Sequence, residues 1–146
     1  MPSLQNFWSE TRQLVSMQRI FILAGVLNIA GIPLFSLGFT NRYLVELYPS
    51  VFSMFGLYTI ILWGIAYIVA APRYGRFPGI VLVFALEKLG YGLTWLPWIV
   101  QHGGDLGAIF ERSWLTGLFY VIYGPIDLGF GLFFVWVFIQ HRKGAS

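Results

Sequence analysis

Four apolar stretches dominate the sequence, and each is long enough to cross a lipid bilayer as a helix. They cover residues 20–39, 51–71, 79–100 and 115–139. A helix needs roughly 20 apolar residues to span a hydrocarbon core about 30 Å thick, whereas strands of a membrane barrel alternate apolar and polar residues over roughly 10 positions. Because lipid offers no hydrogen bonds, each spanning segment must satisfy its own backbone. The stretches therefore predict an all-α membrane protein with four transmembrane helices.

The composition agrees with a membrane protein and excludes several other classes. Of the 146 residues, 58% are hydrophobic and only 10% are charged, whereas soluble domains carry about 25% charged residues. The net charge of +3 is small, so we expect the lipid bilayer as a partner and no nucleic acid. The sequence contains no cysteine, which excludes disulfides and thiolate ligands. His102 and His141 are expected on opposite sides of the membrane, so no metal site is predicted.

The connections between the stretches are short. They cover residues 40–50, 72–78 and 101–113. Short connections make consecutive helices antiparallel neighbours. We therefore expect a single transmembrane domain over residues 1–146, folded as an up-down-up-down four-helix bundle.

The basic residues predict the orientation of the bundle. One side of the membrane would carry six of them, against two on the other side (Arg12, Arg19, Arg73, Arg76, Arg142 and Lys143, against Arg42 and Arg112). Because loops rich in Lys and Arg stay in the cytoplasm, both termini are expected there. Residues 1–18 place apolar side chains at helical spacing, which is typical of a helix lying on the membrane surface, although a frayed tail fits the same pattern.

Four polar residues fall deep inside the predicted spans. Asn28 lies in the first span, Glu87 and Lys88 lie side by side in the third, and Asp127 lies in the fourth. A single charged side chain at the centre of a membrane helix costs about 2.5–3.5 kcal/mol. These residues are therefore expected to face the bundle interior and to bind one another.

The pairing follows from helical geometry. Adjacent residues diverge by about 100° around a helix, so Glu87 and Lys88 are poorly placed to pair with each other. We expect Lys88 to pair with Asp127, and Glu87 to accept a hydrogen bond from Asn28 or from a tyrosine. Two carboxylates and one ammonium leave one negative charge uncompensated, so Glu87 is expected to carry a proton at neutral pH.

The fourth span carries a stripe of small residues that includes the aspartate. Gly117, Tyr120, Gly124, Asp127 and Gly131 recur at steps of three and four residues, which places them on one helix face. Small residues allow membrane helices to approach closely, so this face is expected to point into the bundle. Further aromatic residues are candidates to line a pocket for a flat hydrophobic ligand (Tyr58, Tyr67, Tyr91 and Trp95).

Three stretches of the chain resemble small bacterial four-helix membrane proteins of the DoxX-like group. They are "GVLNIAGIPLF", "GIAYIVAAPRYGRFPGIVLVFALEKLG" and "YGPIDLGFGLFF". The resemblance implies the inner membrane of a bacterium. Some members of the group are similar to membrane subunits of quinone-linked oxidoreductases.

The sequence leaves three functions open. The polar layer could bind a small hydrophobic molecule or mark a membrane subunit of a larger complex, through Asn28, Glu87, Lys88 and Asp127 with Tyr91, Trp95 and Tyr120. The same charges could instead only clasp the helices of a structural or assembly partner. In the third reading the protein is a small membrane enzyme that uses Glu87 or Asp127 as proton donor. No known enzyme signature or cofactor motif supports one reading over the others.

Overall fold

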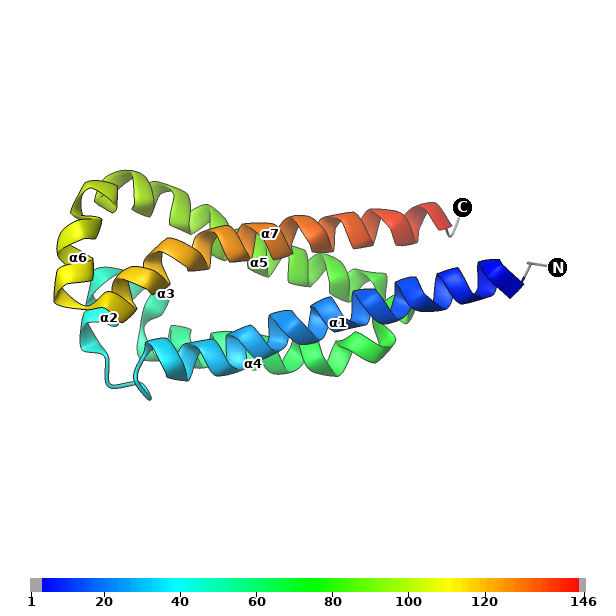
Figure 1. The fold of residues 1–146 in the computed structure, drawn as a ribbon, viewed down its shortest axis with the longest axis horizontal. Helices are drawn as coiled ribbons and strands as arrows, with labels where there is room; N and C mark the ends of the chain where they lie inside the picture. Colours follow the sequence, from blue (N-terminus) through cyan, green and yellow to red (C-terminus); the bar gives the residue numbers. More distant parts are fainter. Residues whose placement is uncertain (1–3, 145–146) are drawn as a thin grey trace.

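A computed structural model describes residues 4–144 of the chain. Its four long helices are α1 (Leu4–Phe35), α4 (Met54–Ala70), α5 (Pro78–His102) and α7 (Trp114–Gly144). Each forms all or most of a helical segment, or contains one, that is long and apolar enough to cross a membrane. Consecutive long helices run antiparallel, and both termini lie at one end, called here the terminal end (Figure 1). The prediction of an all-α four-helix membrane bundle is confirmed.

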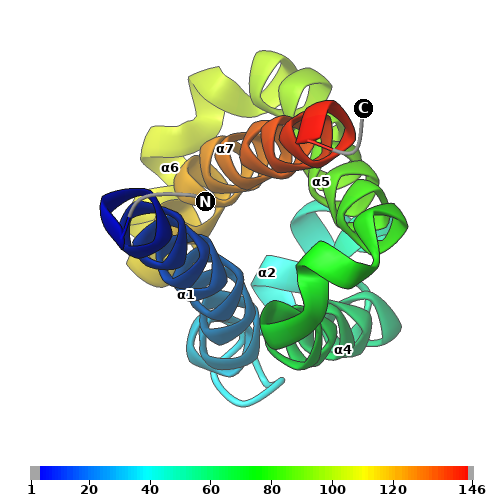
Figure 2. The ribbon, with the colours of Figure 1, turned by 90° about the vertical axis from the view of Figure 1, so that its right-hand side faces the viewer.

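The long helices form a ring of two tightly packed pairs. Seen along the bundle axis, they follow one another as α1, α4, α5 and α7 (Figure 2). In one pair α1 packs on α4, and in the other α5 packs on α7. Glycines permit both close approaches, because a methyl group on Gly25 would lie 2.6 Å from the carbonyl oxygen of Gly64 and one on Gly124 would lie 2.0 Å from the Trp95 ring. In the small-residue stripe predicted on the fourth span, Gly124 and Gly131 therefore face α5, whereas Gly117 faces Phe110 of α6.

The two seams between the pairs are looser. Few close contacts join α1 to α7 or α4 to α5. Aromatic clusters bridge the pairs above and below the middle of the membrane. The cluster near the terminal end contains Phe21, Tyr67, Phe84 and Phe134, and the cluster at the far end contains Phe52, Phe119, Tyr120 and Tyr123.

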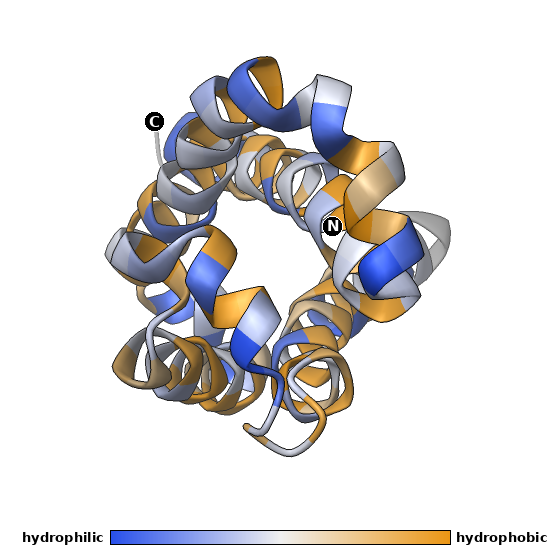
Figure 3. Cartoon of the chain, turned by 90° about the vertical axis from the view of Figure 1, so that its left-hand side faces the viewer, coloured by the Kyte–Doolittle hydropathy of each residue, from blue (hydrophilic) through white to orange (hydrophobic). Residues whose placement is uncertain are grey.

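The connections contain short helices that close the far end of the bundle. They are α2 (Arg42–Leu47), α3 (Pro49–Phe52), η2 (Gly103–Asp105) and α6 (Leu106–Arg112), while η1 (Ala71–Arg76) lies at the terminal end. Apolar side chains of α2, α3 and α6 are buried against the long helices. Seen from this end, the short helices carry both hydrophilic and hydrophobic residues (Figure 3). The sequence analysis treated these segments as plain loops.

The first helix differs from its predicted bounds at both ends. It ends at Phe35 instead of residue 39, because Leu37, Gly38 and Phe39 have positive φ angles of 50°, 63° and 69°. The Asn41 side chain donates to the carbonyl of Phe35 at 3.0 Å and so closes the turn. At its start, α1 continues without a break from Leu4. The position of residues 1–18 on the membrane surface stays a prediction, and residues 1–3 lie outside the described part.

Candidate functional site

Helix α5 presents Glu87 and Lys88 to different neighbours. Lys88 reaches the seam beside α1 and α7, whereas Glu87 reaches Tyr67 on α4. This divergence follows from the turn of about 100° between adjacent helical residues. Together with Asn28 and Asp127, these side chains join all four long helices near mid-membrane. We call Asn28, Tyr67, Glu87, Lys88 and Asp127 the polar layer.

The Lys88 ammonium lies at the centre of the polar layer. The residue is only 2% exposed, and its Nζ donates to Asp127 Oδ1 at 2.7 Å and to Asn28 Oδ1 at 3.0 Å. Nζ also lies 5.5 Å from the centroid of the Tyr67 ring. The structure thus pairs Lys88 with Asp127, as the helical geometry predicts, and adds Asn28 as a second acceptor for the ammonium.

Asn28 fixes this arrangement on α1. Its Nδ2 donates to the carbonyl of Ile60 on α4 at 3.2 Å. Because both ends of the amide are used, the Asn28 side chain has one defined orientation. Asn28 therefore links α1 to α4 and to the ammonium, and it is not the donor to Glu87.

The partner of Glu87 is a tyrosine. The Tyr67 hydroxyl donates to Glu87 Oε2. The other carboxyl oxygen, Oε1, is buried and has no hydrogen-bond partner among the described residues. Among the described residues, the Glu87 carboxyl therefore has one hydrogen-bond donor and no ion-pair partner.

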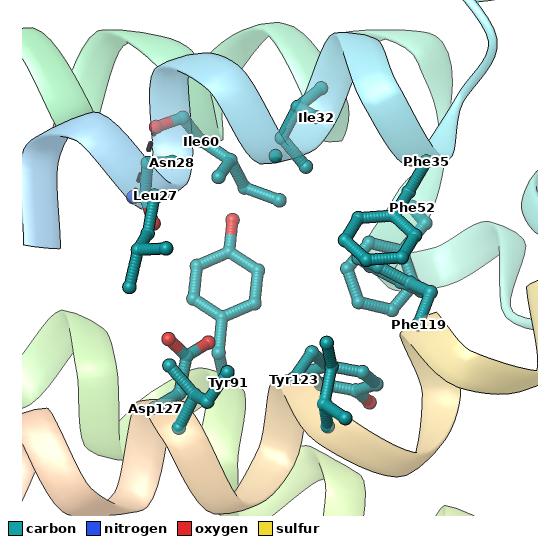
Figure 4. Close-up of a pocket in the computed structure, with 13 residues that line it drawn as sticks. Leu27, Asn28, Ile32, Phe35, Phe52, Ile60, Tyr91, Phe119, Tyr123 and Asp127 are labelled. Carbon is teal, nitrogen blue, oxygen red and sulfur yellow. Dashed lines mark hydrogen bonds between the residues drawn. The ribbon is translucent and has the colours of Figure 1, made fainter. Parts of the chain in front are cut away.

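A cavity of about 110 Å³ meets the polar layer on the seam between α1 and α7. We call it the α1–α7 cavity. Asn28 and Asp127 line one end, rings of Phe35, Phe52 and Phe119 line the other, and Tyr91 stands between them (Figure 4). The remaining wall comes from α1, α4 and α7 (Leu27, Gly31, Ile32, Ile60, Ile122, Tyr123 and Ile126). It is apolar apart from the Tyr123 hydroxyl, which is buried and has no hydrogen-bond partner among the described residues.

A groove of about 470 Å³ meets the polar layer on the opposite seam, between α4 and α5. We call it the α4–α5 groove. Glu87 and Thr94 are its polar residues, and its wall is otherwise formed by apolar and aromatic side chains and one glycine (Val51, Trp63, Val83, Leu86, Gly90 and Tyr91). Tyr91 lines both hollows.

Two of the candidate residues lie away from the polar layer. The Trp95 indole donates to the carbonyl of Tyr120 at 2.7 Å, and the Tyr120 hydroxyl donates to the carbonyl of Leu44 at 2.8 Å. These bonds hold α5, α7 and α2 together at the far end of the bundle. Neither residue lines the cavity or the groove. Tyr58, another aromatic candidate, is 54% exposed.

Sequence reasoning missed most of the cavity wall. Gly31 and Ile32 follow Asn28 by three and four residues, and Tyr123 precedes Asp127 by four, so each shares a helix face with its polar neighbour. That spacing was a usable signal. No such signal existed for Phe52, because it reaches the cavity from α3, a connection.

Comparison of the chain with protein-family models, with curated proteins and with solved structures gave no match. Within residues 4–144, no three His, Asp or Glu side chains are grouped so that they could hold a metal ion. The geometry of the polar layer and its two hollows must therefore carry the functional argument.

Proposed function

We propose that the protein binds a small hydrophobic molecule in the α1–α7 cavity, and that this molecule donates a hydrogen bond to Asp127. The observation that carries the proposal is the position of a carboxylate at the end of an otherwise apolar and aromatic cavity. Binding sites for small molecules commonly combine apolar walls with a few converging polar groups.

The size of the cavity indicates what fits. Its volume of about 110 Å³ is close to that of an engineered apolar cavity of about 150 Å³ that accommodates benzene. One ring, or an equivalent piece of chain, would fill the space. The rest of the molecule would extend through the loose seam between α1 and α7 into the lipid.

The polar end selects a hydrogen-bond donor. Asp127 Oδ1 accepts from Lys88, and the carboxylate also lines the cavity, where a ligand could donate to it. The Tyr91 hydroxyl points toward α1 across the cavity (Figure 4). A hydroxyl-bearing ring or lipid alcohol matches this combination. The resemblance to DoxX-like proteins fits the same class, because a quinol carries hydroxyl groups on a ring.

The rival function is a purely structural one, and a specific observation favours it. Lys88, Asn28 and Asp127 are joined by short hydrogen bonds across three helices, which is what a helix clasp requires. A membrane subunit that docks on a partner protein would use the clasp in the same way.

Mass spectrometry of molecules that co-purify with the full-length protein tests the proposal. Two variants provide matched controls, because a Cβ at Gly31 or at Gly90 meets nothing within 4 Å. Gly31→Leu fills the α1–α7 cavity, and Gly90→Leu fills the α4–α5 groove. We expect an apolar hydroxylated molecule with the wild type and with Gly90→Leu, and its loss from Gly31→Leu. The same set of molecules on all three proteins would contradict the proposal.

A further inference from the structure

The α4–α5 groove has a different chemistry from the α1–α7 cavity. It is the more open of the two hollows, with a volume of about 470 Å³ against about 110 Å³. It reaches the acid of the polar layer that has no bound cation, Glu87, whereas the cavity reaches Asp127, whose carboxylate is paired with Lys88. The groove therefore lies against a carboxyl that has no ion-pair partner among the described residues.

The ionisable groups of the polar layer do not balance in charge. Glu87 and Asp127 supply two carboxylates and Lys88 supplies one ammonium. The ammonium lies 2.7 Å from Asp127, and Glu87 Oε1 is left without a partner. A buried carboxylate requires either a proton or a positive charge close to it. The polar layer thus lacks one positive charge, and the deficit lies at the groove.

The walls of the groove suit an organic cation. Trp63 and Tyr91 line it together with Glu87, and the faces of Trp and Tyr rings attract cations, more strongly where water is excluded. The other side chains of the wall are apolar except Thr94, whose hydroxyl donates to the carbonyl of Tyr91 at 2.8 Å. An inorganic ion would find only one carboxyl there, whereas an organic cation would also bury apolar surface.

We propose that the α4–α5 groove binds a lipophilic organic monocation, with the positive charge beside Glu87 and the apolar groups against Trp63, Tyr91 and the aliphatic wall. Such a molecule supplies the missing positive charge and matches the wall chemistry. The site is separate from the α1–α7 cavity and does not depend on the function proposed for it.

Cation binding at this site is coupled to a proton. In the empty groove a proton on Glu87 balances the charge of the polar layer, and a bound cation replaces it. The groups that face Glu87 are Tyr67 from α4, Asp127 from α7, and Lys88 and Tyr91 from α5 itself. Lys88 and Asp127 are already paired with each other, and both tyrosines remain neutral at ordinary pH, so Glu87 is the group that releases the proton.

Calorimetric titration of the full-length protein in detergent with tetraphenylphosphonium tests the proposal. Triphenylphosphine oxide serves as the neutral comparison probe. We expect the cation to bind with release of about one proton, and Glu87→Gln to weaken binding by about tenfold or more, as loss of one buried ionic contact implies. Glu111→Gln, an exposed acid on α6, is the matched control and should leave the affinity unchanged.

The groove and cavity variants separate this proposal from the previous one. Gly90→Leu should abolish cation binding and Gly31→Leu should retain it. Gly90→Leu also keeps the test decisive if Glu87→Gln does not fold, since a Cβ at Gly90 meets no other atom within 4 Å. Equal binding of the neutral probe would assign the groove to a neutral lipid. That result, or full affinity in Glu87→Gln, would overturn the proposal.

Discussion

On the α1–α7 side of the polar layer, Asp127 accepts from an ammonium at 2.7 Å, whereas on the α4–α5 side Glu87 accepts from a tyrosine hydroxyl alone. Both acids lie at similar depth, and each lines a hollow in a loose seam. The difference arises because Lys88 can turn to only one of them. Glu87 and Lys88, although adjacent on α5, thus give the two seams different electrostatics. The acid at the α1–α7 seam is paired with a cation, and the acid at the α4–α5 seam is not. We call these seams the compensated and the uncompensated side.

Breaking the Lys88–Asp127 ion pair on the compensated side should have the largest effect on stability. Lys88→Met leaves Asp127 charged and unpaired, and Asp127→Leu leaves the ammonium unpaired. Removing one partner of a buried ion pair costs about 3–5 kcal/mol, while replacing both by apolar residues is often tolerated. We expect the double variant to be more stable than either single variant, as measured by thermal unfolding in detergent. A double variant as unstable as the sum of the single ones would show that the pair is not a unit.

Disturbing the packing beneath the compensated side should have an intermediate effect. Gly124→Ala would place a methyl group 2.0 Å from the Trp95 ring, and overpacking of this kind costs about 1–3 kcal/mol. Gly129→Ala on the same helix is the matched control, because a Cβ there meets nothing within 4 Å. Thermal unfolding should separate the two variants, and equal midpoints would argue against the close α5–α7 contact.

Changing the uncompensated side should have the smallest effect on stability. Tyr67→Phe removes the one donor to Glu87 found among the described residues and should cost about 1 kcal/mol. Glu87→Gln should change stability by less than that, since the amide still accepts from Tyr67 and carries no charge. The infrared band of a neutral carboxyl at pH 7 should be present in the wild type and absent from Glu87→Gln. A carboxylate band in its place would contradict a protonated Glu87.

The sequence predicted the elements of this fold better than their pairing. The length of the apolar runs is enough to place four helices, and the glycine spacing around Asp127 is enough to choose its face. Gly25 and Gly64, however, are single glycines with no repeating pattern, so nothing local indicates that α1 and α4 approach closely there. The division into two tight pairs and two loose seams comes from such contacts.

The candidate site was predicted in part for a related reason. Helical geometry predicts different partners for Glu87 and Lys88, and it leaves Asn28 or a tyrosine as the donor to Glu87. In the structure this donor is Tyr67. Trp95 shares a helix face with Lys88, and Tyr120 shares one with Asp127, which is why the sequence predicts both in the polar layer. Each lies seven residues from its polar neighbour, about 10 Å along the axis, and that distance places both in the far aromatic cluster.

The contrast between the two seams can be tested most directly on one set of purified proteins. Wild type, Gly31→Leu and Gly90→Leu are compared for the co-purified hydroxylated molecule and for tetraphenylphosphonium binding. We expect a crossover, in which Gly31→Leu loses only the neutral molecule and Gly90→Leu loses only the cation. Loss of both ligands in either variant, or retention of both in each, would contradict the assignment of separate chemistries to the two seams.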